Sequence, residues 1–157
     1  MSGTVLGRLA SGQVVFDRPR SHMHKSVRAL LPEIFKNITT AEPFVVYEYV
    51  FDRVVGLNHC VETGAVDEII FALRAGRRGP TRFVKKRKPE PTNKAVVILK
   101  QIEDGYILIT AFVGPRAERE PWETGATEKE RAFWRTHALI YGSEEIVAGS
   151  ETQDCPW

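Results

Sequence analysis

The chain has few of the features that would place it outside the cell or in a membrane. It contains only two cysteines in 157 residues, Cys60 and Cys155, and a secreted disulfide scaffold would show more of them, in pairs. Its first residues show no basic-then-apolar signal pattern, and no apolar run approaches the roughly 18 residues that a membrane span needs. We therefore expect a cytoplasmic protein that does not act at a membrane.

The chain also has little excess of charge of one sign, because 22 Lys and Arg residues are balanced by 20 Asp and Glu residues and the net charge is only +2. The hydrophobic fraction of 43% and the charged fraction of 27% are ordinary for a globular protein. A chain of this length usually forms one domain and can bury a sizeable core without a disulfide or a metal. We expect a single α+β domain over residues 1–142, followed by an acidic C-terminal tail over residues 143–157. The tail contains Glu144, Glu145, Glu151 and Asp154. Because of these four acids, we hypothesise that the tail folds back on a basic surface of the protein.

The clearest local signal is a β-hairpin. Residues 94–102 and 106–113 are β-rich, and Asp104-Gly105 between them is a strong two-residue turn signal. The run 95–99 is apolar without alternation, which is typical of a central strand buried on both faces. With further β-rich runs upstream, the sequence predicts an antiparallel sheet of about four to six strands.

Two helices are predicted beside this sheet. The first lies in the N-terminal half, where apolar residues recur with helical spacing, and Pro32 either kinks it or marks a start near Leu31. We expect it to pack on one face of the sheet. The second begins with the capping box of Thr127 and Glu130 and stops at Gly142. Its predicted apolar face consists of Phe133, Trp134, His137, Ile140 and Tyr141.

A basic stretch is the first candidate for function. No acidic residue interrupts it, and such a local field attracts phosphates and polyanions. The alternatives are a solvated loop without a specific role and a surface that docks an acidic protein. Its eight cations are Arg74, Arg77, Arg78, Arg82, Lys85, Lys86, Arg87 and Lys88.

Three smaller features could take part in chemistry. His59 is a candidate proton carrier, although a histidine near a strand end often has only a structural role. Thr110 is the one hydroxyl in an apolar run, and it faces either a structural partner or a substrate phosphate. His22 and His24 would share one face of a strand, but no further cluster with metal-ligand spacing accompanies them. We expect neither a metal nor a cofactor.

The segment DEIIFALRAGRRGPTRFVK and the hairpin ending DGYILITAFVG resemble the barnase–EndoU–colicin–RelE group of metal-independent ribonucleases, especially its bacterial and phage-borne members. The resemblance covers roughly residues 25–113. It implies a helix packed on a curved antiparallel sheet that binds RNA on its open face. It further implies that His59 is the proton carrier, Arg82 and Lys85 are the strand cations, and Thr110 is the late-strand hydroxyl. No acidic general base is obvious in the sequence.

We therefore expect a metal-independent endoribonuclease that cleaves RNA through attack of the 2′-hydroxyl. A growth-inhibiting toxin is one kind of protein that has this activity. Arg82 and Lys85 would stabilise charge on the phosphate, and the 2′-hydroxyl would confine cleavage to RNA. An acidic antitoxin or immunity protein is an expected partner. The alternatives are a non-catalytic RNA-binding module and an interaction domain for an acidic protein. The cations expected to bind RNA are Arg74, Arg77, Arg78, Lys86, Arg87 and Lys88.

Overall fold

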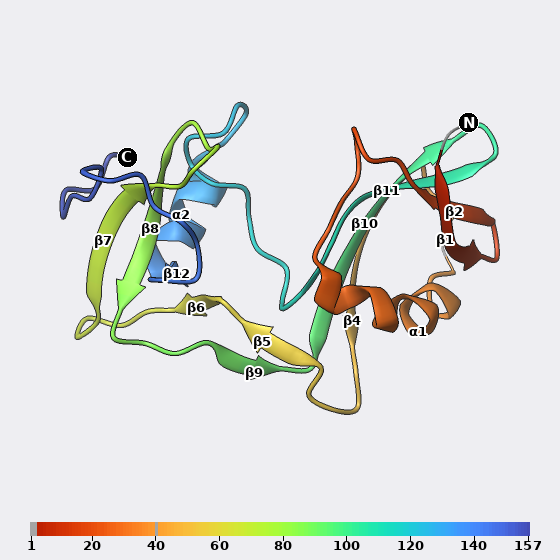
Figure 1. The fold of residues 1–157 in the computed structure, drawn as a ribbon, viewed down its shortest axis with the longest axis horizontal. Coiled ribbons are helices and arrows are strands. Elements are labelled where there is room, and N and C mark those ends of the chain that lie inside the picture. The colour runs from red at the N-terminus through yellow and green to blue at the C-terminus, as the bar shows by residue number, and fades with distance from the viewer. Residues whose placement is uncertain (1–2, 40) are drawn as a thin grey trace. The chain divides into compact units, whose positions relative to one another are not determined.

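The computed structural model describes residues 3–39 and 41–157, and it has an α+β fold. Contacts between residues divide the chain into two compact units. The first unit comprises Met1–Gly56 and Pro91–Arg116, and the second comprises Leu57–Glu90 and Ala117–Trp157 (Figure 1). This division is finer than the single domain expected over residues 1–142. Because each unit is assembled from segments far apart in the sequence, no linker composition marks it.

The first unit contains a mixed sheet with strand order β1-β2-β11-β10-β4, in which β3 also pairs with β11. The pairs β1–β2, β10–β11 and β10–β4 are antiparallel, whereas β11 runs parallel to β2 and β3. The strands are β1 (Thr4–Leu9), β2 (Gly12–Phe16), β3 (His22–Met23), β4 (Phe44–Val50), β10 (Lys94–Ile102) and β11 (Gly105–Val113). The predicted hairpin is therefore confirmed, and β10 lies inside the sheet, between β11 and β4, as its unbroken apolar run indicated.

The turn between β10 and β11 depends on Gly105. Its φ of 148° is a conformation that favours glycine, and a Cβ atom there would lie 2.4 Å from the carbonyl oxygen of Gln13. Farther along the hairpin, the register shifts so that Ile98 faces Thr110 while Leu99 faces Leu108. This leaves one extra residue in β11, which is a β-bulge.

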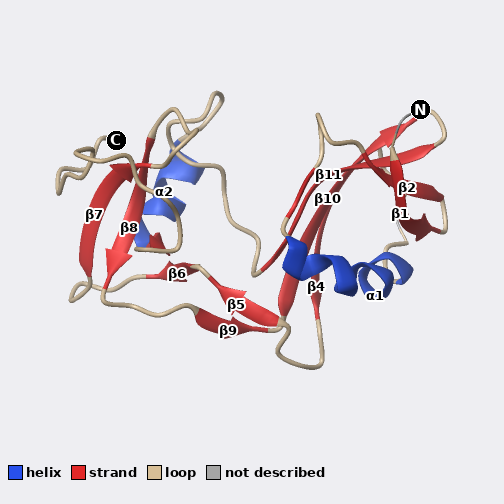
Figure 2. Ribbon diagram, viewed as in Figure 1, coloured by secondary structure: helices blue, strands red, loops and turns tan. Residues whose placement is uncertain are grey.

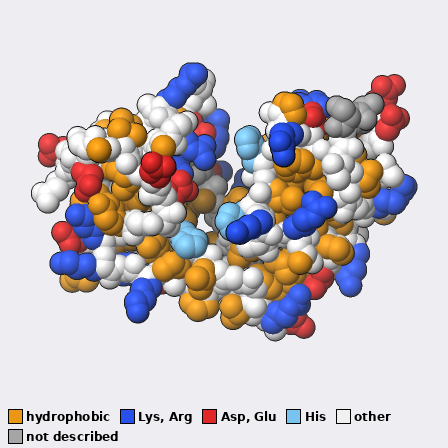
Figure 3. All heavy atoms as spheres, in the orientation of Figure 1, with side chains coloured by type: hydrophobic (Ala, Val, Ile, Leu, Met, Phe, Trp, Pro, Cys, Tyr) orange, Lys and Arg blue, Asp and Glu red, His pale blue; other side chains and the backbone are white. Residues whose placement is uncertain are grey.

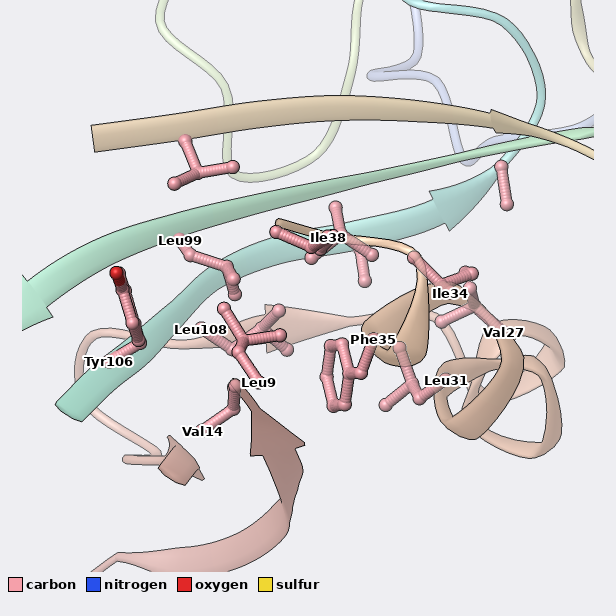
Figure 4. Packing of buried hydrophobic residues seen from close by; sticks show 14 of the residues in the cluster. Leu9, Val14, Val27, Leu31, Ile34, Phe35, Ile38, Leu99, Tyr106 and Leu108 are labelled. Atoms are coloured by element: carbon pink, nitrogen blue, oxygen red, sulfur yellow. The ribbon is translucent and has the colours of Figure 1, made fainter. Parts of the chain in front are cut away.

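A short helix covers one face of this sheet. A 3₁₀ turn (Lys25–Leu30) leads into α1 (Leu31–Lys36), and Pro32 lies in the first turn of α1, as one of the two predicted arrangements required. Figure 4 shows Leu31, Ile34 and Phe35 gathered with core residues of the sheet. Their burial anchors the helix, because each large apolar side chain removed from water contributes about 1.5–3 kcal/mol.

The second unit contains a four-stranded sheet with order β6-β12-β8-β7. Its one helix, α2, is drawn in blue in Figure 2. β12 is antiparallel to β6 and parallel to β8, and β7 is antiparallel to β8. Its elements are β6 (Cys60–Glu62), β7 (Glu68–Leu73), β8 (Pro80–Lys85), α2 (Glu128–Thr136) and β12 (His137–Ile140). The short strands β5 (Gly56–Asn58) and β9 (Glu90–Thr92) pair where the chain passes from one unit to the other. In the described part of the chain, no helix is long and apolar enough to cross a membrane.

The second helix begins as predicted but ends early. The capping box is present: the backbone N–H and the hydroxyl of Thr127 both donate to the Glu130 carboxylate, at 2.9 and 2.6 Å. The predicted extension of the apolar face through residues 137–141 is wrong, because α2 ends at Thr136 and His137–Ile140 is a strand. Pairing on both sides, with β6 and β8, overrides the helical periodicity there.

Candidate functional site

The basic stretch lies in the second unit, where it forms the end of β7, the turn to β8, β8 itself and the loop that follows. Arg77 and Arg78 are exposed in the turn, and Lys88 is exposed in the loop. Among the described residues, none of these three forms a salt bridge with a carboxylate. They are the cations of the stretch that are most available to a ligand.

Arg74 instead lies inside the second unit, with only 7% of its surface exposed. Its guanidinium donates to the carboxylate of Glu120, which is also buried, and its Nε atom donates to the hydroxyl of Thr81 at 3.1 Å. Thr81 in turn donates to Glu120. A second carboxylate oxygen, from Glu144, is 3.3 Å from Arg74 Nη1. Arg74 therefore serves the packing of this unit.

Three further cations of the stretch, Lys85, Lys86 and Arg87, form salt bridges with acidic residues. In addition to its salt bridge, the Lys85 Nζ atom lies 5.0 Å from the centre of the Tyr141 ring. On the face drawn in Figure 3, Lys and Arg side chains lie in separate groups, not in one continuous basic surface. The field expected from the sequence is thus partly neutralised by acids from elsewhere in the chain. The pairs are Lys85 with Glu151 at 3.9 Å, Lys86 with Glu68 at 3.3 Å, and Arg87 with Asp67 at 3.0 Å and Glu90 at 3.3 Å.

Arg82 differs from its neighbours because it is half-buried and has no salt bridge among the described residues. Its Nη1 atom donates to the hydroxyl of Thr63 at 2.9 Å and to the carbonyl of His137 at 3.0 Å. No other hydrogen bond of its guanidinium involves a described residue, so Nε and Nη2 remain unused. Burial lowers the pKa of Arg82, but an arginine stays protonated at neutral pH. The unused edge of the guanidinium fits two oxygens of a phosphate.

His59 lies between β5 and β6, and its side chain is exposed. Its carbonyl accepts a hydrogen bond from Ile140 at 2.9 Å, so its backbone helps to hold β12. Burial raises the pKa of the neighbouring Cys60 thiol to about 12, which makes it a poor nucleophile. The ring of His137 stacks on Phe133, with centroids 4.0 Å apart.

Thr110 belongs to β11 in the first unit, whereas His59, Arg82 and Lys85 all belong to the second. The structure instead pairs Thr110 with His22, through the parallel alignment of β3 and β11. Met23 and Ala111, the residues that follow, pack with the helix-covered core. Because successive residues of a strand point to opposite faces, His22 and Thr110 both lie on the face opposite the helix.

The same alternation places Glu48 of β4 and Lys94 of β10 on this face, which we call the open face. The Glu48 carboxylate accepts a hydrogen bond from the backbone N–H of Arg116 at 2.6 Å, and it lies 3.9 Å from Lys94 Nζ. Phe112 is on the open face too, aligned through the central strand with Glu48. The open face therefore presents a carboxylate, an imidazole, an ammonium, a hydroxyl and an aromatic ring.

Sequence reasoning singled out only the Thr110 hydroxyl and missed the other four groups, which belong to His22, Glu48, Lys94 and Phe112. It considered His22 only as a metal ligand beside His24, and the structure instead bonds the His24 ring to Ser26 at 2.6 Å. It overlooked Glu48, although the polar residue interrupts an otherwise apolar and aromatic strand and could have been noticed for that reason. Among the described residues, no group of His, Cys, Asp and Glu side chains could hold a metal ion.

No protein-family model, curated protein or solved structure matches this chain.

Proposed function

We propose that this chain is a metal-independent endoribonuclease whose site is the open face of the first-unit sheet. The observation that supports the proposal most is the alignment of His22 with Thr110 on the same face as Glu48 and Lys94. These side chains supply a general acid, a general base and a cation, which are the groups that transesterification of RNA requires without a metal. The resemblance of residues 25–113 to such ribonucleases supports RNA as the substrate, although of the four site residues that it implies only Thr110 lies on the open face.

In the proposed reaction, the 2′-oxygen of a ribose attacks the adjacent phosphorus while the bond to the 5′-oxygen of the next nucleotide breaks. Glu48 accepts the proton of the 2′-hydroxyl, and a protonated His22 gives a proton to the departing 5′-oxygen. The products are a 2′,3′-cyclic phosphate and a 5′-hydroxyl. Lys94 and the Thr110 hydroxyl stabilise the negative charge that develops on the phosphate oxygens.

The spacing of the groups determines how a nucleotide would bind between them. Glu48 and His22 are separated by three strand spacings and one two-residue step along the strands, which corresponds to about 16 Å between their Cα atoms. Side chains stand roughly perpendicular to a sheet, so both must lean toward Phe112 to reach one ribose and its phosphate. Phe112 lies between them and offers a surface on which a base can stack.

RNA as substrate would place the activity in the cytoplasm. Cleavage of cellular RNA would also inhibit growth. The proposal therefore includes a role for this protein as a toxin that an acidic partner protein neutralises. The exposed Arg77, Arg78 and Lys88 would then attract either the RNA or that partner.

A non-catalytic RNA-binding module is the second candidate, and the second unit favours it. Arg82 has two guanidinium nitrogens, Nε and Nη2, that form no hydrogen bond with a described residue, and Arg77, Arg78 and Lys88 are exposed on the same basic stretch. Such a module would bind phosphates through these cations and would leave the RNA intact.

The test is incubation of total RNA with the purified protein in EDTA. We expect the wild type to cleave, His22→Ala and Glu48→Gln to lose at least about 100-fold in rate, and His59→Ala to cleave normally. His59→Ala is the matched control, since it removes an exposed histidine from the other unit. Circular dichroism of each variant verifies folding. Loss of activity in His59→Ala alone would refute the open face as the site. Retention of RNA without cleavage would support the binding module, provided that Arg82→Ala abolishes it.

A further inference from the structure

The edge of β7 in the second unit is occupied by the acidic tail, residues 143–157. β7 is the last strand of its sheet, and such an edge exposes backbone N–H and C=O groups that can pair with another strand. The tail hydrogen-bonds to this edge, and two of its carboxylates contact Arg74 and Lys85 of the basic stretch. The hydrogen bonds are Ala75 N–H to Glu145 O, Val147 N–H to Leu73 O, Phe71 N–H to Thr152 O and Thr152 N–H to Phe71 O, at 3.1, 2.8, 2.7 and 2.8 Å.

The tail is an imperfect strand. It makes only isolated bridges with the β7 edge, Arg74 with Ile146 and Phe71 with Thr152, and the register changes between them. In the gap, the Leu73 N–H donates to the side-chain hydroxyl of Ser150 at 3.0 Å in place of a backbone carbonyl. A continuous extended peptide would pair with this edge without the interruption and would make more backbone hydrogen bonds.

The side chains of the tail define the chemistry that this edge accepts. Residues 143–157 contain four acids and no Lys or Arg. Glu144 contacts Arg74 at 3.3 Å, and Glu151 contacts Lys85 at 3.9 Å and accepts a hydrogen bond from the Tyr141 hydroxyl at 3.1 Å. The Trp157 ring packs edge-on against Phe71, with centroids 5.2 Å apart. The segment that occupies the edge is therefore acidic and has an aromatic side chain packed against β7.

We propose that the edge of β7 is a docking site for an extended acidic peptide from a partner protein, and that residues 143–157 are its built-in competitor. The partner adds a strand to the sheet, so backbone hydrogen bonds supply affinity while Arg74 and Lys85 select acidic side chains. A partner that displaces the tail also breaks the ion pair of Lys85 with Glu151 and replaces it with one to an acidic side chain of the partner. This inference does not depend on ribonuclease activity, because all its contacts lie within the second unit.

Competition from the tail sets the expected size of the effect. A tethered segment has an effective concentration of the order of millimolar, so it weakens the binding of the same sequence added as a separate peptide. Weakening the tail should therefore tighten the binding of an added peptide by at least about tenfold.

The experiment uses the full chain and a fluorescent synthetic peptide with the sequence of residues 143–157, followed by anisotropy. Thr152→Pro removes the N–H that donates to Phe71 and so weakens the pairing of the tail with the edge. Asp154→Asn is the matched control, because it removes a tail charge that has no salt bridge among the described residues. We expect at least about tenfold tighter binding to Thr152→Pro than to the wild type, and no change for Asp154→Asn.

A second probe tests the charge selection. The same peptide carrying Lys in place of Glu144 and Glu151 should not bind either protein, because its cations would face Arg74 and Lys85. If Thr152→Pro fails to fold, the double variant Glu144→Gln, Glu151→Gln weakens the tail without changing its backbone and should tighten the binding by about threefold, a smaller effect because both ion pairs are partly exposed. Equal binding to the wild type and to a folded, weakened variant would overturn the proposal, as would equal binding of the charge-reversed peptide.

Discussion

Replacement of Arg74 by methionine should destabilise the second unit strongly. Arg74 and Glu120 are each 7% exposed, and Thr81, which hydrogen-bonds to both, is fully buried. Methionine preserves most of the side-chain volume but leaves the Glu120 carboxylate buried without its cation. Loss of one partner of a buried ion pair costs about 3–5 kcal/mol, because the remaining charge stays desolvated. The contact with the more exposed Glu144 adds little to this value.

The assay is urea unfolding followed by tryptophan fluorescence. All three tryptophans, Trp122, Trp134 and Trp157, lie in the second unit, so this signal reports its unfolding. Arg77→Met is the matched control, because it makes the same change at an exposed position of the same basic stretch. It should change the free energy of unfolding by less than about 0.5 kcal/mol.

A double variant separates the effect of charge from that of volume. Arg74→Met combined with Glu120→Leu removes both charges, so the pair should recover much of the stability that the single variant loses. The Thr81 hydroxyl then lacks its acceptor, which limits the recovery. Equal stability of Arg74→Met and Arg77→Met would refute the reasoning, and it would return Arg74 to the cations available for RNA.

Two further predictions concern titratable groups in the second unit. Hydrogen bonds from the Thr127 hydroxyl and backbone lower the pKa of Glu130 from its ordinary value of 4.5 to about 2, so this carboxylate stabilises the fold above pH 4.5 and the contribution disappears as the pH falls toward 2. Unfolding midpoints measured across this range should fall less steeply in Glu130→Gln than in the wild type, and parallel curves would contradict the assignment. Because burial raises the pKa of Cys60 to about 12, iodoacetamide at pH 8 should modify the exposed Cys155 and spare Cys60 until the protein is denatured; mass spectrometry of the native protein showing both modified would contradict this.

Several elements could be predicted from the sequence because their signals are local. The Asp104-Gly105 turn and its flanking apolar runs predicted the hairpin of β10 and β11, and the capping box of Thr127 and Glu130 predicted the start of α2. Pro32 restricted where the first helix could begin. In each case the backbone conformation depends on residues within a few positions of one another, so long-range contacts did not change the conformation that the local sequence favours.

The candidate site depended on the tertiary structure. The basic stretch has no acid within it, but Glu120, Glu144 and Glu151 reach it from distant segments, and only folding brings those charges together. The partnership of His22 with Thr110 requires a parallel pairing across the sheet that no local pattern specifies.

The α+β class, the hairpin of β10 and β11 and the start of α2 follow from the amino-acid sequence alone, because short-range hydrogen bonding and apolar periodicity decide these features. The tertiary structure alone decided that the residues after α2 form the strand β12, that Arg74 is buried, and that the acidic tail lines β7. Each of these outcomes depends on hydrogen bonds or ion pairs between residues far apart in the chain. The energies of these interactions depend on strand register and on burial, so they produce no local sequence pattern from which they could be predicted.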